Sequence, residues 1–242
     1  LAQLTNGGAP VEGGAPTQVG EGGEARWSQD GKMIYYASND RDPNYFDIYT
    51  LEFYGSSSDA ELVETLIYKQ DGNNSVEAIS DNGKKLIISR SGTELSLDND
   101  LYLFNVETNK TVLLTKHTGA AQYGNAHFVA DGIVFAHNDG RKFISLAQMR
   151  KKNAARDDWS PENRETTILD NTRWDVGDVE MNDYGSMIAY TINRDGFSEL
   201  YLRKYETGGK PLITTVDKNA ETVKLPEPGI IGGLTFSKDQ TK

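Results

Sequence analysis

Short apolar runs alternate with glycine-containing turns along this chain, and the same arrangement occurs four times. In each copy a large apolar residue precedes a turn that holds Asp and Gly, and an apolar run follows at once. Asp or Asn with Gly before such a run is a strong short-range signal for a β-hairpin. The copies read WSQDGKMIYYASN (27–39), ISDNGKKLIIS (79–89), FVADGIVFAH (128–137) and MNDYGSMIAYT (181–191), and FSKDQ (236–240) begins a fifth.

The residues around these turns keep one register. The turn glycines are Gly31, Gly83, Gly132 and Gly185, which stand 52, 49 and 53 residues apart. We expect a type I′ turn at each, with positive φ at both central residues. The structural anchors of the repeat stand four places before each glycine, at Trp27, Ile79, Phe128 and Met181, and Phe236 holds this place in the fifth copy. Apolar residues also stand three places after each glycine, at Ile34, Leu86, Phe135 and Ile188.

Two further strands are predicted in each repeat. Third strands are expected at DIYTLEF (47–53), DLYLFNV (100–106) and ELYLRKY (199–205), and FISLAQM (143–149) is the best candidate in the third repeat. Fourth strands are expected at ELVETLIY (61–68), TVLLT (111–115), ETTILD (165–170) and PLITT (211–215). Four strands that recur about every 50 residues indicate a β-propeller blade, because stacked blades cover the faces that one sheet leaves open. A β-sandwich with similar hairpins is the alternative, but it gives no reason for a shared register.

The sequence therefore predicts an all-β protein, a β-propeller of four-stranded antiparallel blades over residues 1–242. About four blades are complete, and partial blades are expected at both ends. LAQLT (1–5) is typical of the outer strand of an earlier blade, and FSKDQ of the first strand of a later one. We expect a piece of a larger ring of about seven or eight blades, with a ring completed by two copies as the alternative.

Two segments depart from the repeat. Residues 6–24 are rich in Gly and Pro and are predicted to form a loop or flexible link. Residues 144–164 contain a helix-favouring stretch and are predicted to be a helical or loop insertion. Its basic residues stand out on an acidic chain, and they are either solvated or a contact surface for a neighbouring domain or an anionic substrate group. They are Arg150, Lys151 and Lys152.

Charge and composition exclude several classes of function. The formal net charge is −11, and so acidic a chain would repel a phosphate backbone, which argues against nucleic-acid binding. No apolar run approaches the roughly 20 residues of a membrane helix, so no membrane span is expected. The chain has no Cys, which excludes disulfides and thiolate metal sites. The compartment stays open, with a lean towards a periplasmic or secreted protein.

Candidate chemistry is sparse. No Gly-x-Ser-x-Gly occurs, so the nucleophile elbow of a hydrolase is not present in this sequence. Three histidines without an ordered carboxylate partner make a weak metal site, and acidic loops are explained as turn formers better than as calcium ligands. We therefore predict no catalytic, cofactor-binding or metal-binding residue here. The residues considered are His117, His127 and His137, and Asp40, Asp42, Asp98, Asp100 and Asp195.

The repeat resembles WD40-like blades of two groups. The carriers are WSQDGKMIYYASNDRDPNYFDIYTL (27–51) and MNDYGSMIAYTINRDGFSELYL (181–202), with Leu-Thr phrases at 4–5 and 114–115. One group is the propeller protein of the Tol system. The other is the N-terminal propeller of prolyl-oligopeptidase-family serine peptidases. The repeat length of about 50 residues and the insertion at 144–164 are more similar to the peptidase propellers.

The resemblance implies a non-catalytic role. In the peptidase family the propeller caps a C-terminal α/β-hydrolase domain, which carries the catalytic triad, and it restricts entry to peptide substrates. The expected partners are therefore such a domain of the same parent chain, or another protein, and a peptide. A free-standing Tol-like scaffold is the alternative. A propeller enzyme or lectin that uses the central channel is a third hypothesis.

Overall fold

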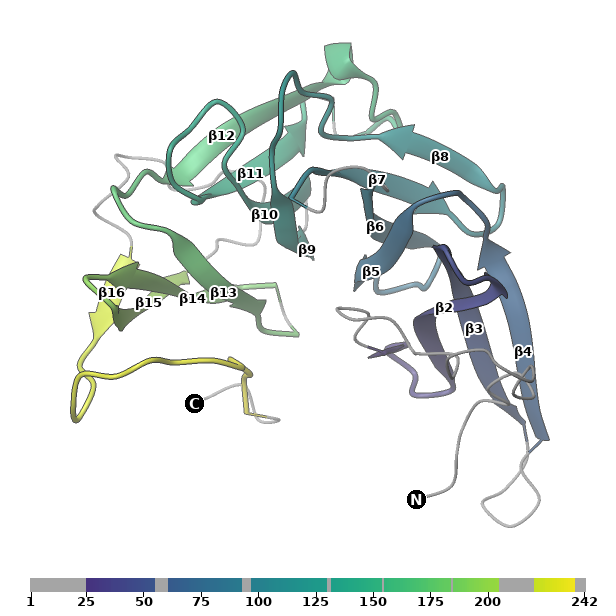
Figure 1. Ribbon diagram of the computed structural model, residues 1–242, viewed down its shortest axis with the longest axis horizontal. Helices are drawn as coiled ribbons and strands as arrows, with labels where there is room; N and C mark the ends of the chain where they lie inside the picture. Colours follow the sequence, from purple (N-terminus) through teal and green to yellow (C-terminus); the bar gives the residue numbers. More distant parts are fainter. Residues whose placement is uncertain are drawn as a thin grey trace. The chain divides into compact units, whose positions relative to one another are not determined.

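The computed structural model contains strands and almost no helix (Figure 1). It describes residues 25–54, 61–92, 97–129, 132–153, 155–183, 185–204 and 220–237. The predicted strands at 1–5 and 211–215, the predicted loop at 6–24 and most of FSKDQ lie outside these residues. The chain divides into two compact units, residues 1–113 and 114–242, and each is described by itself.

The first unit holds two four-stranded antiparallel sheets of up-and-down order, here called meanders. The single parallel pair Phe46–Asn73 joins an inner strand of the first meander to the first strand of the second. The first meander consists of β1 (Arg26–Trp27), β2 (Met33–Asp42), β3 (Tyr45–Tyr54) and β4 (Glu61–Tyr68). The second consists of β5 (Asn73–Ile79), β6 (Lys85–Ser91), β7 (Asn99–Asn105) and β8 (Lys110–Leu113).

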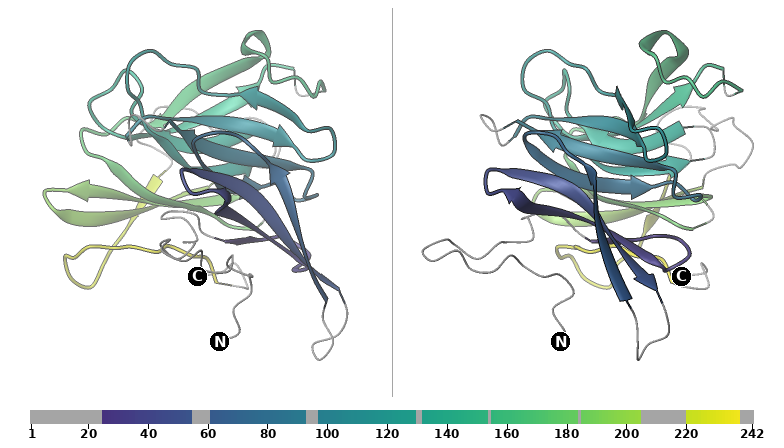
Figure 2. Two further views of the ribbon diagram at one scale, coloured as in Figure 1. Left: turned by 45° about the vertical axis from the view of Figure 1, so that its right-hand side comes forward. Right: turned by 90° about the vertical axis from the view of Figure 1, so that its right-hand side faces the viewer.

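The second unit repeats this arrangement, and Figure 2 shows the twist of the strands within the sheets. The third meander consists of β9 (Tyr123–Val129), β10 (Gly132–His137), β11 (Ser145–Lys151) and β12 (Arg164–Asp170), with the short helix η1 (Pro161–Asn163) before β12. The fourth consists of β13 (Val176–Met181), β14 (Met187–Arg194), β15 (Phe197–Lys204) and β16 (Ala220–Val223). The predicted class, all-β with four-stranded antiparallel sheets, is confirmed.

The segment 144–164 differs from the predicted insertion. Residues 145–151 form β11, a regular strand between β10 and β12, so a helix or loop over this part was wrong. The helix-favouring composition is overridden because these side chains are needed in the sheet, and the first five residues of β11 are buried. Between β11 and β12, residues 152–163 lie outside the strands and contain η1.

The hairpin turns are longer than predicted. In the first meander Ser28 N donates to Met33 O at 2.8 Å and Gly31 N donates to Ser28 O at 2.9 Å, so four residues lie in the loop. Positive φ falls on Gly31 (68°), while Asp30 is not among the described residues with positive φ. The type I′ expectation was therefore wrong. Ser28 Oγ accepts from Met33 N at 3.0 Å, which fixes the longer loop.

The second and fourth meanders use the same loop. Gly83 N donates to Ser80 O at 2.7 Å and Ser80 N donates to Lys85 O at 2.9 Å. In the fourth meander Asn182 takes the place of the serine, and its Oδ1 accepts from Met187 N at 2.9 Å. A side chain three places before the glycine thus closes each of these three loops.

The third meander lacks that loop. Gly132 is the first residue of β10 and pairs with Val129, so its hairpin connection is two residues shorter. Gly132 is not among the described residues with positive φ. As a consequence, Phe128 pairs with Ile133, the residue directly after its glycine, whereas the anchors of the other three meanders pair with the residue three places after theirs. The assignment of Gly132 as a turn glycine was wrong.

Replacing Gly83 with valine tests the turn. Gly83 has φ +68°, and the only neighbour of an added Cβ is Tyr35 Oη at 3.7 Å, so the cost arises from backbone conformation and not from crowding. We expect the free energy of unfolding to fall by more than about 1 kcal/mol in urea titration. Gly92→Val, at an exposed glycine without positive φ, is the control and should change stability little. Equal stabilities would contradict the left-handed conformation of Gly83.

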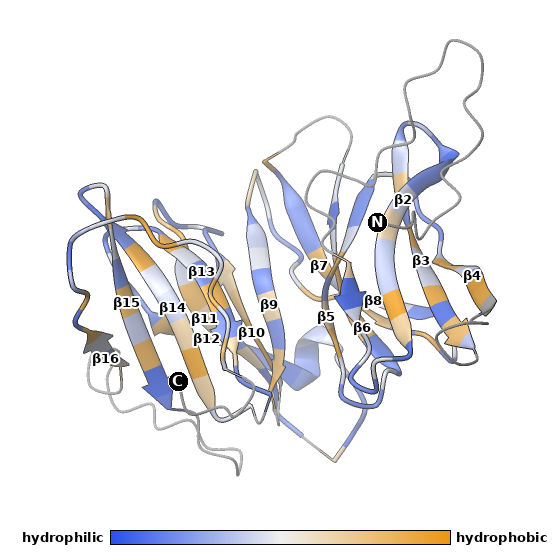
Figure 3. Cartoon of the chain, turned by 90° about the horizontal axis from the view of Figure 1, so that it is seen from below, coloured by the Kyte–Doolittle hydropathy of each residue, from blue (hydrophilic) through white to orange (hydrophobic). Residues whose placement is uncertain are grey.

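Apolar side chains between neighbouring meanders form the core of each unit, and Figure 3 shows apolar residues along β14 and the strands near it. Of the predicted anchors, Met181 is buried, while Ile79, Phe128 and Phe236 are partly buried. Trp27 differs, because it is 58% exposed and stacks on Phe53 with ring centroids 5.5 Å apart. In the described part of the chain it lies at the surface of the first meander.

Candidate functional site

A polar pocket of about 320 Å³ lies in the third meander. Residues 140–143, from the loop between β10 and β11, line one side, and residues 171–173, which follow β12, line the other. Three of the seven lining residues carry positive charge, although the chain as a whole is strongly acidic. This concentration of cations makes the pocket the best candidate for a binding site in the described residues. The three are Arg141, Lys142 and Arg173.

The loop side of the pocket is held by backbone hydrogen bonds. Arg141 N donates to Asn138 O at 2.8 Å, and Gly140 takes the left-handed conformation (φ 63°) that closes this turn. Asn138 in turn fixes the loop to the residue that precedes β9, because its Oδ1 accepts from Gln122 N at 2.7 Å. These hydrogen bonds fix the position of the loop, whose residues 141–143 line the pocket.

Hydrogen bonds also hold the opposite side of the pocket, which residues 171–173 line. Thr172 Oγ1 accepts from Trp174 N at 3.1 Å, which shapes the turn after β12. Asp175 Oδ1 accepts from Ile144 N at 2.8 Å, and Val176 N donates to Ile144 O at 3.0 Å. These two bonds join the end of the β10–β11 loop to the start of β13, so both sides of the pocket belong to one hydrogen-bonded framework.

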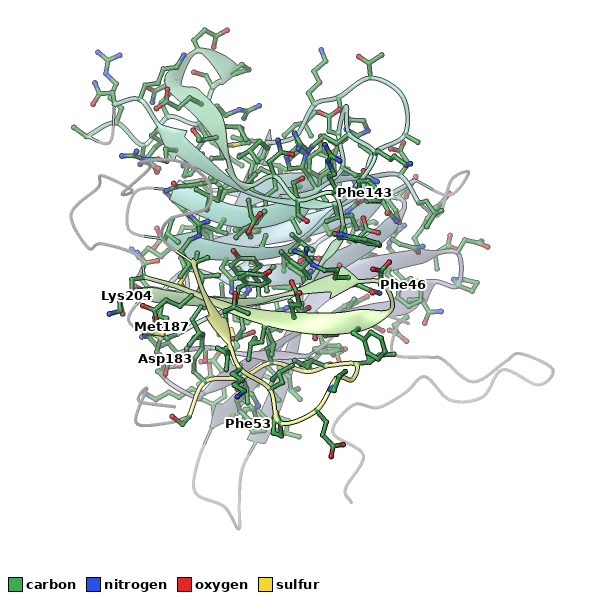
Figure 4. The ribbon with its side chains drawn as sticks, turned by 90° about the vertical axis from the view of Figure 1, so that its left-hand side faces the viewer. Phe46, Phe53, Phe143, Asp183, Met187 and Lys204 are labelled. Atoms are coloured by element: carbon green, nitrogen blue, oxygen red, sulfur yellow. The ribbon has the colours of Figure 1, made fainter. Side chains whose placement is uncertain are left out.

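Two of the three cations of the pocket have neutral partners. Arg141 Nε donates to Ser145 Oγ at 2.8 Å, and its Nη2 donates to Asn171 Oδ1. Lys142 Nζ lies 5.2 Å from the ring centre of Phe143, which Figure 4 labels. None of these three cations forms an ion pair with another residue in the part of the chain that the structure describes. Their charge is therefore available to a ligand.

A second cavity, of about 560 Å³, lies in the fourth meander between the β14–β15 hairpin and residues 225–228. Its arginine is already neutralised, because Arg194 Nε lies 3.0 Å from Glu199 Oε2. Tyr201 Oη donates to the same carboxylate oxygen at 2.6 Å, and burial, with this bond, raises the pKa of Tyr201. The lining also includes Asp195 and Glu227, so this cavity combines apolar surface with acidic side chains and has no unpaired cation.

The predicted contact surface 150–152 is not a single patch. Arg150 and Lys151 are consecutive strand residues, and such side chains point to opposite faces of a sheet. Lys151 Nζ lies 5.6 Å from the ring centre of Trp159, and Lys152 Nζ donates to Glu162 O at 2.9 Å. Two of the three cations thus hold the connection between β11 and β12 in place.

The histidines have separate environments. His137 lies between Phe135 and Tyr123, and the Tyr123 ring also contacts His117. His127 lies elsewhere on β9, and its Nε2 donates to Val179 O at 2.9 Å. No group of three or more His, Asp or Glu suited to a metal ion occurs among the described residues, and Asp42 accepts hydrogen bonds from Asn44 as a turn former.

Burial makes His137 a pH-sensitive group. Desolvation lowers the pKa of His137, the charge of Asp139 opposes this and that of Arg141 adds to it. The unfolded chain therefore binds the proton more readily than the folded one. Stability is complete above the ordinary histidine pKa of about 6.5 and is lost as the pH falls below it.

We expect the melting temperature to fall as the pH is lowered below about 6.5, with a contribution of up to about 1.4 kcal/mol per pH unit from this one proton. His137→Phe should remove that contribution, so the variant's stability curve should be flatter over this range. Asp139 N donates to His137 Nδ1 at 3.2 Å, so some loss of stability at pH 7 is also expected. Parallel curves for both proteins would contradict this assignment.

Comparisons with known proteins support the fold. No protein-family model and no curated protein sequence matches the chain. Solved structures do: a protein described as TolB from Agrobacterium tumefaciens has a TM-score of 0.58 at 13% identity, over 82% of this chain and 63% of that one. Oligopeptidase B from Trypanosoma brucei has a TM-score of 0.54 at 15% identity, over 85% and 27%. Prolyl oligopeptidase B from Galerina marginata has 0.55 at 12%, over 76% and 26%.

These neighbours define the class of the fold. The chain has the architecture of β-propeller domains, and the resemblance to TolB and to the propellers of prolyl and B-type oligopeptidases is confirmed at the level of the fold. The chain spans less than two thirds of the length of each of these solved structures. No helix of the described residues is both long and apolar enough to cross a membrane. The meanders are called blades from here on.

Proposed function

We propose that this chain is the non-catalytic propeller portion of a prolyl-oligopeptidase-like serine peptidase, in which it gates or positions peptide substrates. In this proposal the four blades belong to a larger ring, and the hydrolase chemistry belongs to an α/β-hydrolase domain of the same parent chain. The observation that carries the proposal is the construction of one face of the first blade.

That face carries a cluster formed by β2 and β3. Ile34, Tyr36, Tyr49 and Leu51 are buried in it, and Phe53 packs against it. The rings of Tyr36 and Tyr49 stack with centroids 5.9 Å apart. A large apolar sheet face needs a second layer, because a single sheet cannot bury it.

The fourth blade carries an equivalent face. By strand register, Ile188 and Tyr190 of β14 and Tyr201 of β15 correspond to Ile34, Tyr36 and Tyr49. Tyr190 and Tyr201 also stack, with centroids 5.4 Å apart. This face of the fourth blade packs against the third, in one core with residues that include Val134, Ala136, Leu146 and Leu169. The equivalent face of the first blade carries the same kinds of side chain and is buried as well, so its composition is that of a face between blades, which supports a larger ring.

The repeat length favours the peptidase alternative. The spacings of about 50 residues and the connection at 152–163 between β11 and β12 fit peptidase propellers, whose TM-scores reach 0.55. In such a chain the propeller would cover only part of the length, and the peptidase neighbour from Trypanosoma brucei is matched over 27% of its chain. The catalytic serine is then expected outside the 242 residues.

The parent reading frame tests the proposal. We expect a hydrolase domain with Gly-x-Ser-x-Gly downstream of Lys242, and the purified parent should react with a fluorophosphonate serine probe. It should cleave a short peptide but not the same sequence inside a folded protein. A stop codon soon after Lys242 would refute the peptidase parent, and equal cleavage of both substrates would refute gating.

A Tol-like protein-binding scaffold is the second candidate, favoured by the TM-score of 0.58 with the TolB structure. It predicts a short reading frame without a hydrolase domain. It also predicts that cell-envelope proteins co-purify with the chain, and recovery of none above background would count against it.

A further inference from the structure

The four blades share a polar position at the start of the third strand. By register with the second strand, Asp47 pairs with Ser38, Asp100 with Arg90 and Glu199 with Ile192. The corresponding residue of the third blade is Ser145, which pairs with His137. Three blades therefore carry a carboxylate at this position, and the third blade alone of the four carries a hydroxyl.

In the first and fourth blades the carboxylate neutralises an arginine of the adjacent loop or strand end. Arg41 donates to both oxygens of the fully buried Asp47, with Nη2 at 3.1 Å from Oδ1. Arg194 Nε lies 3.0 Å from Glu199 Oε2. In these two blades the charge of the arginine is thus neutralised by an acid of the same blade.

The third blade has the arginine, Arg141, but a serine in place of the acid. Arg141 Nε donates to the hydroxyl of Ser145, whose residue is fully buried, and Nη2 donates to the Asn171 amide oxygen. Two of its five N–H groups are satisfied by neutral acceptors, which orient the guanidinium without cancelling its charge. The other three remain for a ligand in the pocket that Arg141 lines.

We propose that this pocket binds a carboxylate of a peptide or protein ligand, with Arg141 as the oriented donor. Lys142 and Arg173 add two positive charges to the same lining. Two carboxylates lie nearby: Asp175, whose Oδ1 accepts from Ile144 N, and Asp139, beside His137. The lining itself holds three cations and no carboxylate, so the pocket is positive.

The chemistry of the lining favours a carboxylate on an organic group. A guanidinium fork matches the two oxygens of a carboxylate, and the ring of Phe143 offers apolar contact to the group that bears it. A pocket of about 320 Å³ is near the lower end of the usual range for small-ligand sites, which suits one terminal residue. This inference is independent of the peptidase proposal, because it concerns only the third blade.

The test is calorimetric titration of the full chain with acetyl-Ala-Ala-Phe that has a free carboxylate and with its C-terminal amide. We expect the free acid to bind at least ten-fold more tightly and its binding to weaken as salt is added. Arg141→Gln and Arg173→Gln should each weaken binding of the acid several-fold or more. Lys152→Gln, which changes a cation outside the pocket, should leave it unchanged.

Ser145→Asp is the sharpest variant, because it restores the acid that the other blades carry. It should abolish binding of the free acid, with folding verified by its melting curve. If this variant does not fold, the exposed Arg173→Gln decides the question. Equal binding of acid and amide, no binding of either, or binding of inorganic phosphate alone would overturn the proposal.

Discussion

Replacing Gly132 with alanine is expected to lower the free energy of unfolding by about 3 kcal/mol or more. A Cβ at this position would lie 2.0 Å from Met149 O, 3.0 Å from the Met149 carbonyl carbon and 3.1 Å from Arg150 Cα. These are backbone atoms of the central strand β11, so a change of side-chain rotamer cannot relieve the clash. The strand would have to move away from β10, which strains the pairs Gly132–Arg150 and Ile133–Met149.

Chemical denaturation followed by circular dichroism measures this loss. Gly124→Ala is the matched control, because it lies in β9 of the same blade with no atom within 4 Å of an added Cβ. It should change stability by no more than about 0.5 kcal/mol. Similar unfolding midpoints for the two variants would show that β10 and β11 do not approach each other as closely as the structure has them.

The repeat of strands could be predicted because it rests on local patterns. Apolar runs, turn residues and their spacing are all visible in one sequence, and they identified the second and third strands of every blade. The third hairpin was harder, since its Asp-Gly looks like that of the first. The discriminating signal was the residue three places before the glycine, which is Val129 here and a side-chain hydrogen-bond acceptor, Ser28, Ser80 or Asn182, in the other three.

The candidate pocket could not be predicted in the same way. Arg141 and Arg173 are 32 residues apart, and only the pairing of β11 with β12 brings their segments together. The basic run at 150–152 is conspicuous because its charges are adjacent in sequence. In a strand, however, consecutive side chains point to opposite faces of the sheet, so adjacency in sequence does not make a patch. One signal was present: the third repeat has Ser145 where the other third strands begin with an acid, and Arg141 and Lys142 precede it.

Asp170→Ala is expected to cost about 3 kcal/mol of unfolding free energy, because it removes the acceptor of a buried hydrogen bond between the third and fourth blades. Tyr190 Oη donates to Asp170 Oδ2 at 2.6 Å, and Tyr190 is fully buried. Arg203, also buried, donates from Nη2 to Leu169 O at 2.8 Å beside this pair. Without the carboxylate, a phenol and a guanidinium would remain in the core with fewer acceptors.

A double-mutant cycle in urea isolates this interaction. Tyr190→Phe alone should cost about 1.5 kcal/mol, and Tyr190→Phe added to Asp170→Ala should cost clearly less, because the hydroxyl no longer has an acceptor to lose. Tyr36→Phe is the control, since Tyr36 occupies the same place in the first blade but donates to Glu64, an exposed residue of its own blade. We expect it to cost about 0.5 kcal/mol. Burial, with the Asp170 carboxylate, raises the pKa of Tyr190, so the phenol keeps its proton throughout the measurement. Strict additivity of the two substitutions would contradict a direct bond between the blades, whereas non-additivity would identify Asp170 and Tyr190 as the polar contact that fixes how one blade packs on the next.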